Sequence, residues 1–202
     1  YEVSYEDDNG APQTATVSTE GKAVVPKNNQ VTLKFPAKNG TNPNPSEASE
    51  GNETFDILTK LTTAADTNND IKTGFNWDDK SYEYVINSAA ESSYEFKATY
   101  TTSHVVHIQT VGGTLDEAAI ANFVKKDDDK TNYRVIVPNE QTISDLKFTP
   151  DNSLTNPVLS AKWLKNDGAT KLGEVTFTDE GNAKKVSTPA VTEPAYLKAS
   201  FL

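Results

Sequence analysis

The chain has 202 residues, of which 19 are Lys or Arg and 29 are Asp or Glu, giving a formal net charge of -10 at pH 7. Such an acidic surface repels phosphates and anionic lipid head groups, so we expect neither nucleic acid nor a membrane surface as a partner. No apolar run is long enough to predict a transmembrane helix. The absence of cysteine excludes disulfides, thiol nucleophiles and thiolate metal sites. One long domain, or two of about 100 residues, would fit this length.

Most local patterns predict short strands separated by turns rich in Asn, Asp and Gly. Polar and apolar residues alternate over residues 1–5, and the following Asn9-Gly10 pair is typical of a hairpin turn. Residues 31–35 alternate in the same way until Pro36, which limits pairing. This spacing is typical of small antiparallel sheets. Further strands are expected at residues 55–62, 81–86, 94–100, 104–110, 133–137, 158–164, 174–178 and 196–201.

One segment, Leu115–Lys126, has the pattern of a helix. Its apolar residues fall on one helical face, Thr114 is a suitable N-cap, and two lysines end the segment. Acidic residues in the first turn and basic residues in the last turn would both interact favourably with the helix dipole. We therefore predict a short helix whose apolar face covers a sheet.

Weak matches between the two halves predict that one ancestral unit was duplicated. We therefore expect two domains, residues 1–102 and 103–202, connected between two strands at Thr101-Thr102-Ser103. The first copy also has a polar loop at residues 38–52 with almost nothing to bury. The matching segments are 3–5 with 106–108, 25–35 with 137–148, and 97–100 with 198–201.

The sequence offers few residues for catalysis or metal binding. His104 and His107 are the two histidines, and in a strand residues three apart point to opposite faces, so they cannot jointly hold one metal. No nucleophile elbow or phosphate-binding glycine loop is present. We therefore expect no catalytic residues, no metal and no cofactor.

The run from Asp66 to Asp70 has the oxygen spacing that begins an EF-hand calcium loop. The pattern then fails, because Ile71 stands where glycine is required and Trp77 where a bidentate glutamate should close the site. A calcium loop and a solvated turn both remain open, and the pattern favours the turn.

Two further patterns, a pair of Asn-x-Thr triplets and a group of aromatic residues, concern contacts with sugars. Asn39 and Asn52 each begin an Asn-x-Thr triplet, the acceptor of N-glycosylation. A group of aromatic residues near the end of the first half would serve either as core or as a sugar-binding platform, and we expect core. The group consists of Tyr82, Tyr84, Tyr94, Phe96 and Tyr100.

Each half resembles a Listeria-Bacteroides repeat, also called the internalin B repeat, a small β-grasp module found in tandem on bacterial surface proteins. The resemblance rests on an opening strand with a glycine turn at residues 3–10 and 106–113, and on closing strands at 94–100 and 196–201. The strand and turn over residues 158–171 are also similar. This family has no catalytic residues, so the resemblance implies adhesion, spacing or assembly.

Two other resemblances compete with this one. Residues 1–10 are about as similar to mucin-binding β-grasp repeats. Residues 24–28 resemble the motif through which sortase joins pilin subunits, which would make Lys27 a crosslinking nucleophile.

We therefore expect a mainly β to α+β fold made of two tandem β-grasp-like modules, each an antiparallel or mixed sheet with at most one short helix. The expected function is that of a non-enzymatic module of a secreted or cell-surface bacterial protein, acting as a stalk, adhesin or assembly unit. Its partner would be another protein, a surface glycan or a second copy. The alternatives are a carbohydrate-binding accessory module of a secreted glycan-active enzyme, and a pilin-like subunit.

Overall fold

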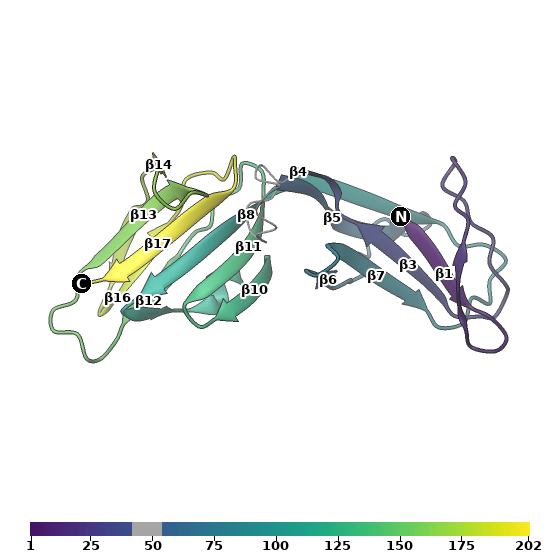
Figure 1. The fold of residues 1–202 in the computed structure, drawn as a ribbon, viewed down its shortest axis with the longest axis horizontal. Coiled ribbons are helices and arrows are strands. Elements are labelled where there is room, and N and C mark those ends of the chain that lie inside the picture. Colours follow the sequence, from purple (N-terminus) through teal and green to yellow (C-terminus); the bar gives the residue numbers. More distant parts are fainter. Residues whose placement is uncertain (42–53) are drawn as a thin grey trace. The chain divides into compact units, whose positions relative to one another are not determined.

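The structure is a computed structural model that describes residues 1–41 and 54–202, and this part of the chain is built mainly from β-strands (Figure 1). The prediction of a mainly β protein is confirmed. Within the described residues there is no α-helix, only a single 3-10 helix, and no helix there is long and apolar enough to cross a membrane.

The chain divides into two compact units. Unit 1 comprises Tyr1–Lys38 and Ile57–Thr101, and unit 2 comprises Asn39–Asp56 and Thr102–Leu202. Each unit is thus formed from two stretches of chain, whereas the predicted modules, residues 1–102 and 103–202, are each continuous. Strands β5 (Thr54–Thr63) and β8 (Phe96–Val111) contribute residues to both units.

Unit 1 contains an antiparallel five-stranded sheet, sheet A, in the order β2-β1-β3-β7-β6. Alternation is clear in β3, where Val31, Leu33 and Phe35 are buried and the residues between them are half-buried. The hairpin from β1 to β2 turns at Gly10, whose φ of +75° suits glycine. The strands are β1 (Glu2–Glu6), β2 (Pro12–Ala15), β3 (Val31–Pro36), β6 (Phe75–Asn76) and β7 (Ser81–Ile86).

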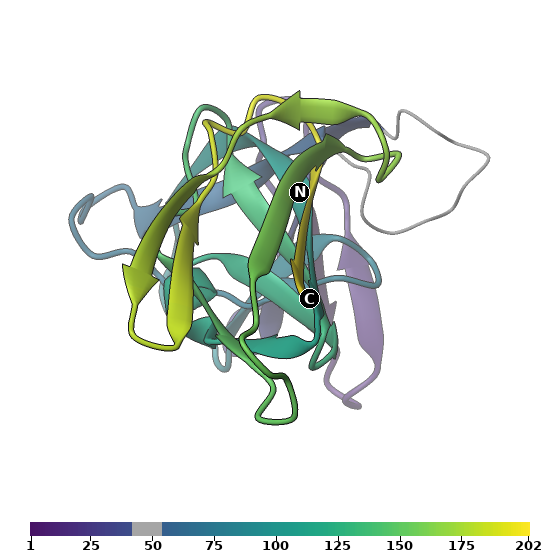
Figure 2. The same cartoon turned by 90° about the vertical axis from the view of Figure 1, so that its left-hand side faces the viewer.

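Unit 2 is a two-layer sandwich. Sheet B has the order β10-β11-β8-β17-β13-β14, and beside this path β4 (Lys38–Thr41) pairs with β5, which pairs with β8. Sheet C has the order β15-β16-β12-β9. In Figure 2 the hairpin of β15 and β16, in yellow-green, stands apart from β13 and β17, in green and yellow. The remaining strands are β9 (Gly113–Leu115), β10 (Val124–Asp129), β11 (Asn132–Pro138), β12 (Leu146–Pro150), β13 (Leu159–Lys165), β14 (Lys171–Gly173), β15 (Thr176–Glu180), β16 (Ala183–Ser187) and β17 (Ala195–Phe201).

The core of unit 2 lies between these two sheets. Sheet B contributes Ile108, Trp163 and Leu197, and sheet C contributes Phe148 and Val186, all of which belong to one buried cluster. Burying apolar surface between two layers is the main source of stability for a sandwich of this kind.

The centre of sheet B is a parallel pair formed by β8 and β17, which places Leu197 beside Ile108 and Lys198 beside Gln109. Side chains alternate between the two faces of a strand. Leu197 and Ile108 therefore point into the core, while the residues that follow them point outward.

The helix predicted over Leu115–Lys126 is wrong. The structure has β9, then the 3-10 helix η1 (Glu117–Ile120), then β10. The N-cap of η1 is Asp116, whose carboxylate accepts a hydrogen bond from the Ala118 N–H at 3.0 Å. From Val124 onward the chain pairs with β11, so backbone pairing with a neighbouring strand overrides local helix propensity.

The expected break between two strands at Thr101-Thr102-Ser103 is wrong, because these residues lie inside the continuous strand β8. One boundary between the two units does fall within the predicted segment, between Thr101 and Thr102. The two units further differ in topology. Strand β1 pairs antiparallel with β2 and β3, whereas β8, its predicted counterpart, lies between antiparallel β11 and parallel β17. This difference contradicts the predicted duplication of one unit.

Replacing Thr110 by Val is expected to stabilise the protein. Thr110 is 2% exposed, and within the described residues its hydroxyl is the buried side-chain oxygen without a hydrogen-bond partner. Because Val removes an unsatisfied polar group at nearly constant volume, Thr110→Val should raise the free energy of unfolding by about 1 kcal/mol. Urea denaturation of the full chain measures this change.

Thr188→Val is the matched control. The Thr188 hydroxyl accepts a hydrogen bond from the Ile143 N–H at 3.0 Å and donates one to the Pro189 carbonyl at 2.9 Å. Its loss should destabilise the protein by about 1–3 kcal/mol. A destabilised Thr110→Val variant would contradict the assigned environment of that hydroxyl.

Gly113→Ala is expected to be strongly destabilising, because a Cβ on Gly113 would lie 2.5 Å from the Thr149 carbonyl oxygen and 2.6 Å from the Phe201 ring. Relieving such a clash in a packed core costs about 1–3 kcal/mol. The control is Gly74→Ala, where a Cβ would meet nothing within 4 Å. Thermal unfolding of both variants tests this, and equal melting temperatures would contradict the close packing at Gly113.

Candidate functional site

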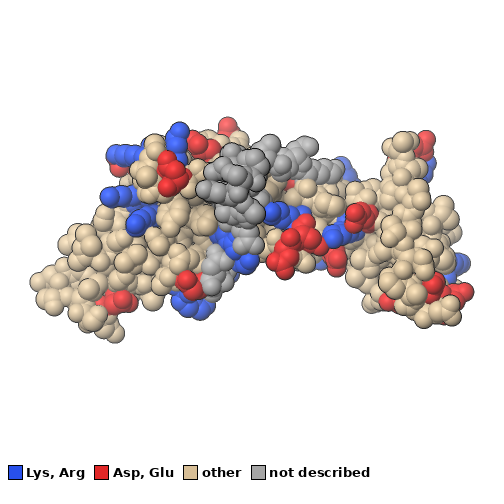
Figure 3. All heavy atoms as spheres, in the orientation of Figure 1, with Lys and Arg blue, Asp and Glu red and all other residues tan. Residues whose placement is uncertain are grey.

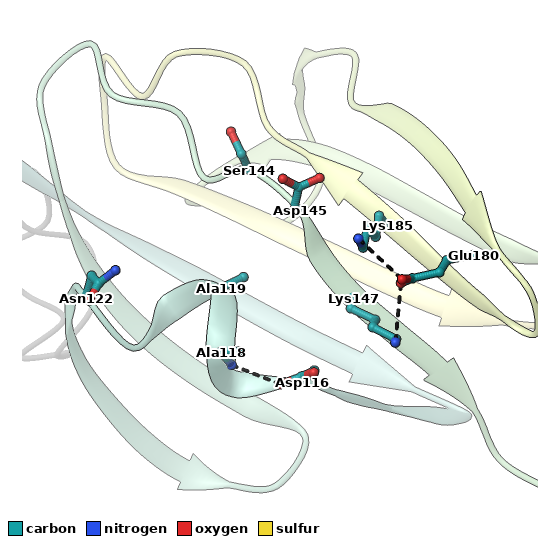
Figure 4. Close-up of a pocket in the computed structure, with 9 residues that line it drawn as sticks. All are labelled: Asp116, Ala118, Ala119, Asn122, Ser144, Asp145, Lys147, Glu180 and Lys185. Carbon is teal, nitrogen blue, oxygen red and sulfur yellow. Dashed lines mark hydrogen bonds and ion pairs between the residues drawn. The ribbon is translucent and has the colours of Figure 1, made fainter.

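Unit 2 carries an open polar recess with a volume of about 500 Å³ (Figure 4). Its lining comes from η1 and the segment after it, from the start of β12, and from the hairpin of β15 and β16. The lining residues are Asp116, Ala118, Ala119, Asn122, Ser144, Asp145, Lys147, Glu180 and Lys185.

One side of the recess is held by an ionic cluster. Lys147 on β12 and Lys185 on β16 lie directly opposite each other in the antiparallel register. The Glu180 carboxylate lies 3.3 Å from the Lys147 ammonium and 3.5 Å from the Lys185 ammonium. Hydrogen bonding to Lys147, followed by the charges of both lysines, lowers the pKa of Glu180 below its usual value. Glu180 is therefore a fixed negative charge at neutral pH.

The other side of the recess presents neutral polar groups and one carboxylate. Ser144 and Asp145 precede β12 and lie together in Figure 4, while Asn122 lies at the far end beside η1. Asp145 has a φ of +58°, and its backbone N–H donates to the Ser187 hydroxyl at 3.0 Å. The side chains of Asn122, Ser144 and Asp145 are exposed. Together they offer an amide, a hydroxyl and a carboxylate to a small polar ligand.

The two histidines have separate partners. His104 is 5% exposed, and its ring nitrogens lie 2.8 Å from the Thr54 hydroxyl and 2.9 Å from the Asn139 side-chain oxygen. His107 is half-buried on the outer face of sheet B and stacks on Tyr196, with ring centroids 5.5 Å apart. Both histidines therefore make structural contacts, and they do not share a site.

The segment from Asp66 to Asp70 forms a turn whose carboxylates bond to the protein itself. Asp66 accepts hydrogen bonds from the backbone N–H groups of Asn68 and Asn69. Asp70 accepts the N–H of Leu61 at 3.0 Å and pairs with Lys72. Within the residues that the structure describes, no three His, Asp or Glu side chains gather as a metal site.

In several other turns, too, an aspartate accepts hydrogen bonds from backbone N–H groups, where the sequence predicts a turn but no such role for the aspartate. Asp7 accepts the N–H groups of Asn9 and Ala11, and Asp167 accepts those of Ala169 and Thr170. The hydrogen bond that the Thr170 hydroxyl donates to Asp167 at 2.6 Å, together with these backbone hydrogen bonds, lowers the pKa of Asp167, and the backbone bonds to Asp7 lower the pKa of that carboxyl. An aspartate followed within four residues by a tight turn is the sequence signal for this role.

Three residues are predicted sites of covalent modification: Lys27 for crosslinking, and Asn39 and Asn52 for glycosylation. Lys27 is exposed in the turn before β3, and its predicted crosslinking role stays a prediction. Asn52 lies outside the described residues. The backbone of Asn39 belongs to β4, its side chain is not described, and glycosylation at both positions stays a prediction.

The aromatic group near the end of the first half lies in unit 1, where one of its five residues is buried. Tyr82 is 4% exposed, and burial raises its pKa to about 12. Tyr84 and Phe96 are half-buried and pack edge to face, with ring centroids 5.6 Å apart. Tyr94 is 42% exposed, and its hydroxyl accepts the Glu91 N–H. Tyr82 is core, as expected, whereas Tyr84, Phe96 and Tyr100 are half-buried and Tyr94 is exposed, so the expectation holds only in part.

Comparisons with known proteins found no matching family model, no similar curated protein and no similar solved structure.

The Glu180→Gln variant is expected to be less stable than the parent at pH 7, with a difference that disappears in acid. The pKa of Glu180 is lowered in the folded state. Its contribution to the free energy of unfolding is therefore complete above the unfolded-state pKa of about 4.3 and is lost as the pH falls through the folded-state pKa. Unfolding at pH 7 and at pH 2 measures this difference. The control Glu174→Gln removes the same charge outside the recess, and a pH-independent effect of Glu180→Gln would contradict the ionic cluster.

Proposed function

We propose that this chain is a non-enzymatic module of a secreted or surface-attached bacterial protein, and that it acts through its exterior as a stalk, adhesin or assembly unit. A module of this kind needs a stable scaffold and outer faces that a partner can reach. The sequence resemblance to β-grasp repeats of bacterial surface proteins implies the same role, although the two units do not share one topology.

The observation that carries this proposal is the division between inner and outer faces in the sandwich of unit 2. In β17, Leu197 and Ala199 are fully buried in the core, whereas Lys198 between them is exposed. In sheet C, Phe148 faces the core, and its neighbour Lys147 lines the polar recess. A sandwich that buries apolar residues between its layers leaves alternate positions such as Lys198 and Lys147 open to partners. Val105, Ile136 and Leu164, on the outer face of sheet B, are buried as well.

The pKa shifts of the carboxyl groups also support a non-enzymatic role. Enzyme active sites hold acids and bases whose pKa values are shifted toward the working pH. Here the shifted carboxyls, such as Asp7, Asp66 and Asp167, have lowered pKa values because they accept hydrogen bonds within their own turns. These groups are used to hold loops.

A second candidate is the carbohydrate-binding accessory module of a secreted glycan-active enzyme. The polar recess favours it, because Asn122, Ser144 and Asp145 offer the amide, hydroxyl and carboxylate groups that bind sugar hydroxyls. A third candidate, the pilin-like subunit, depends on Lys27, whose exposed position in a turn leaves it accessible for crosslinking.

Two measurements on the full chain test the proposal. Light scattering across a concentration series reports self-association, and a glycan array reports sugar binding. The proposed function predicts ordered self-association, glycan binding, or both, without release of product from any bound polymer. Flat array signals together with self-association would remove the carbohydrate candidate, whereas catalytic shortening of a polysaccharide or peptide would contradict the proposal itself.

A further inference from the structure

The outer face of sheet B carries a block of residues that the recess and the turns do not involve. It lies on β8, β17 and β13, where the register aligns three rows of three side chains on one face. We call this block the lysine face. Its rows are His107, Tyr196 and Leu164; Gln109, Lys198 and Lys162; and Val111, Ser200 and Ser160.

Two features characterise the lysine face, and the second is shared with Lys147 and Lys185, which Glu180 bridges. None of its nine residues is acidic, although the chain as a whole has a net charge of -10. The centre of the block is the pair Lys162 and Lys198, which are directly opposite each other on adjacent antiparallel strands. Like charges at directly opposed positions destabilise a sheet, so the scaffold gains nothing from this arrangement.

The two central lysines are accessible. Both are exposed, and neither forms an ion pair with any residue that the structure describes. This contrasts with Lys147, Lys184 and Lys185 of sheet C, each of which pairs with a carboxylate. In Figure 3, basic side chains are visible over the region that Figure 1 draws as β13 and β17.

Polar groups suited to sugar hydroxyls surround the lysine pair. Gln109 lies beside Lys198, and Ser160 and Ser200 oppose each other in the next row, all of them half-buried. Opposed side chains in neighbouring strands have Cβ atoms about 5 Å apart. One carboxylate or sulfate can therefore contact both ammonium groups while the adjacent hydroxyls meet the amide and the serines.

We propose that the lysine face binds a linear acidic polysaccharide, with Lys162 and Lys198 holding a carboxylate or sulfate group and Gln109, Ser160 and Ser200 contacting sugar hydroxyls. This inference rests on the proposed function, because it assigns the partner of a surface module. A polymer charged once per one or two sugars can approach through this one face of an otherwise acidic chain.

The same observations disfavour other partners. Duplex DNA carries one negative charge per about 1.7 Å of its axis, so the acidic remainder of the chain repels it far more strongly. The rings of His107 and Tyr196 stack on each other at 5.5 Å, which occupies one face of each ring and leaves less aromatic surface for single-stranded bases. A protein partner is also disfavoured at this face, because Lys is depleted at protein interfaces.

Calorimetric titration of the full chain at low salt tests the inference, with polygalacturonate as the uronate probe and heparin as the sulfated probe. Dextran is the uncharged control and a single-stranded oligonucleotide is the competing polyanion. We expect binding to one or both acidic polysaccharides, none to dextran, and weakening as salt rises. Binding to polygalacturonate alone, or to heparin alone, identifies which anionic group is recognised.

The double variant Lys162→Gln/Lys198→Gln should weaken this binding by about tenfold, the combined effect of two exposed ion pairs. The control Lys22→Gln/Lys72→Gln removes the same charge from two exposed lysines of unit 1 and should leave binding nearly unchanged. Removing both opposed charges in Lys162→Gln/Lys198→Gln should not lower the melting temperature, and Lys162→Arg/Lys198→Arg should retain binding.

Equal losses in the two double variants, no binding to either acidic polysaccharide, or tighter binding of the oligonucleotide through these lysines would each overturn the inference. The size of the polysaccharide after incubation distinguishes a failure of this inference from a failure of the proposed function. Shortened polymer would contradict the non-enzymatic role, whereas intact but unbound polymer would contradict only the assignment of this face.

Discussion

The parallel pairing of β8 with β17 is the constraint on which the rest of unit 2 depends. It aligns Ile108 with Leu197 and Gln109 with Lys198. Because side chains alternate along a strand, a slip of one residue would bring Lys198 into the core and expose Leu197. Leu197 is fully buried among residues of both sheets, so the hydrophobic core itself fixes the register. The composition of the outer face is therefore a consequence of core packing.

The charges of the chain serve two different purposes. Most of the described carboxylates with lowered pKa values are attached to the scaffold: Asp7 and Asp167 hold turns, and Glu180 fixes two lysines beside the recess. These contacts are strongest when the carboxyls are ionised, which suits a protein that works near neutral pH. By contrast, Lys162 and Lys198 form no ion pair with any residue that the structure describes. Groups that do not support the scaffold are the natural candidates for contact with a partner.

Local alternation predicts much of the strand content of this protein. The segments 31–35, 81–86 and 196–201 are strands in the structure, because their buried and exposed residues alternate as a half-buried strand requires. The segment 183–187 was not predicted, since its adjacent lysines give no alternating pattern. The helix expected after Leu115 fails because the pairing partner of Val124 is Ile136, a contact that no local pattern contains.

The sites are less predictable than the strands, for a physical reason. Lys162 and Lys198 each occupy an outward position that alternation can predict, but their opposition depends on the pairing of β13 with β17. The recess likewise combines Asn122, Asp145 and Glu180 from three separate parts of the chain. Pairing between distant strands is set by packing of the whole sandwich. Local sequence therefore predicts which single residues point outward, but not which of them come together in one site.

The most direct test of this account is a titration of the isotopically labelled full chain with an acidic oligosaccharide, followed by NMR. The account predicts that the shifted backbone and side-chain signals belong to β8, β17 and β13 and centre on Lys162 and Lys198, while strands of unit 1 remain unchanged. Shifts centred on the recess around Asp145, or spread evenly over both units, would contradict it.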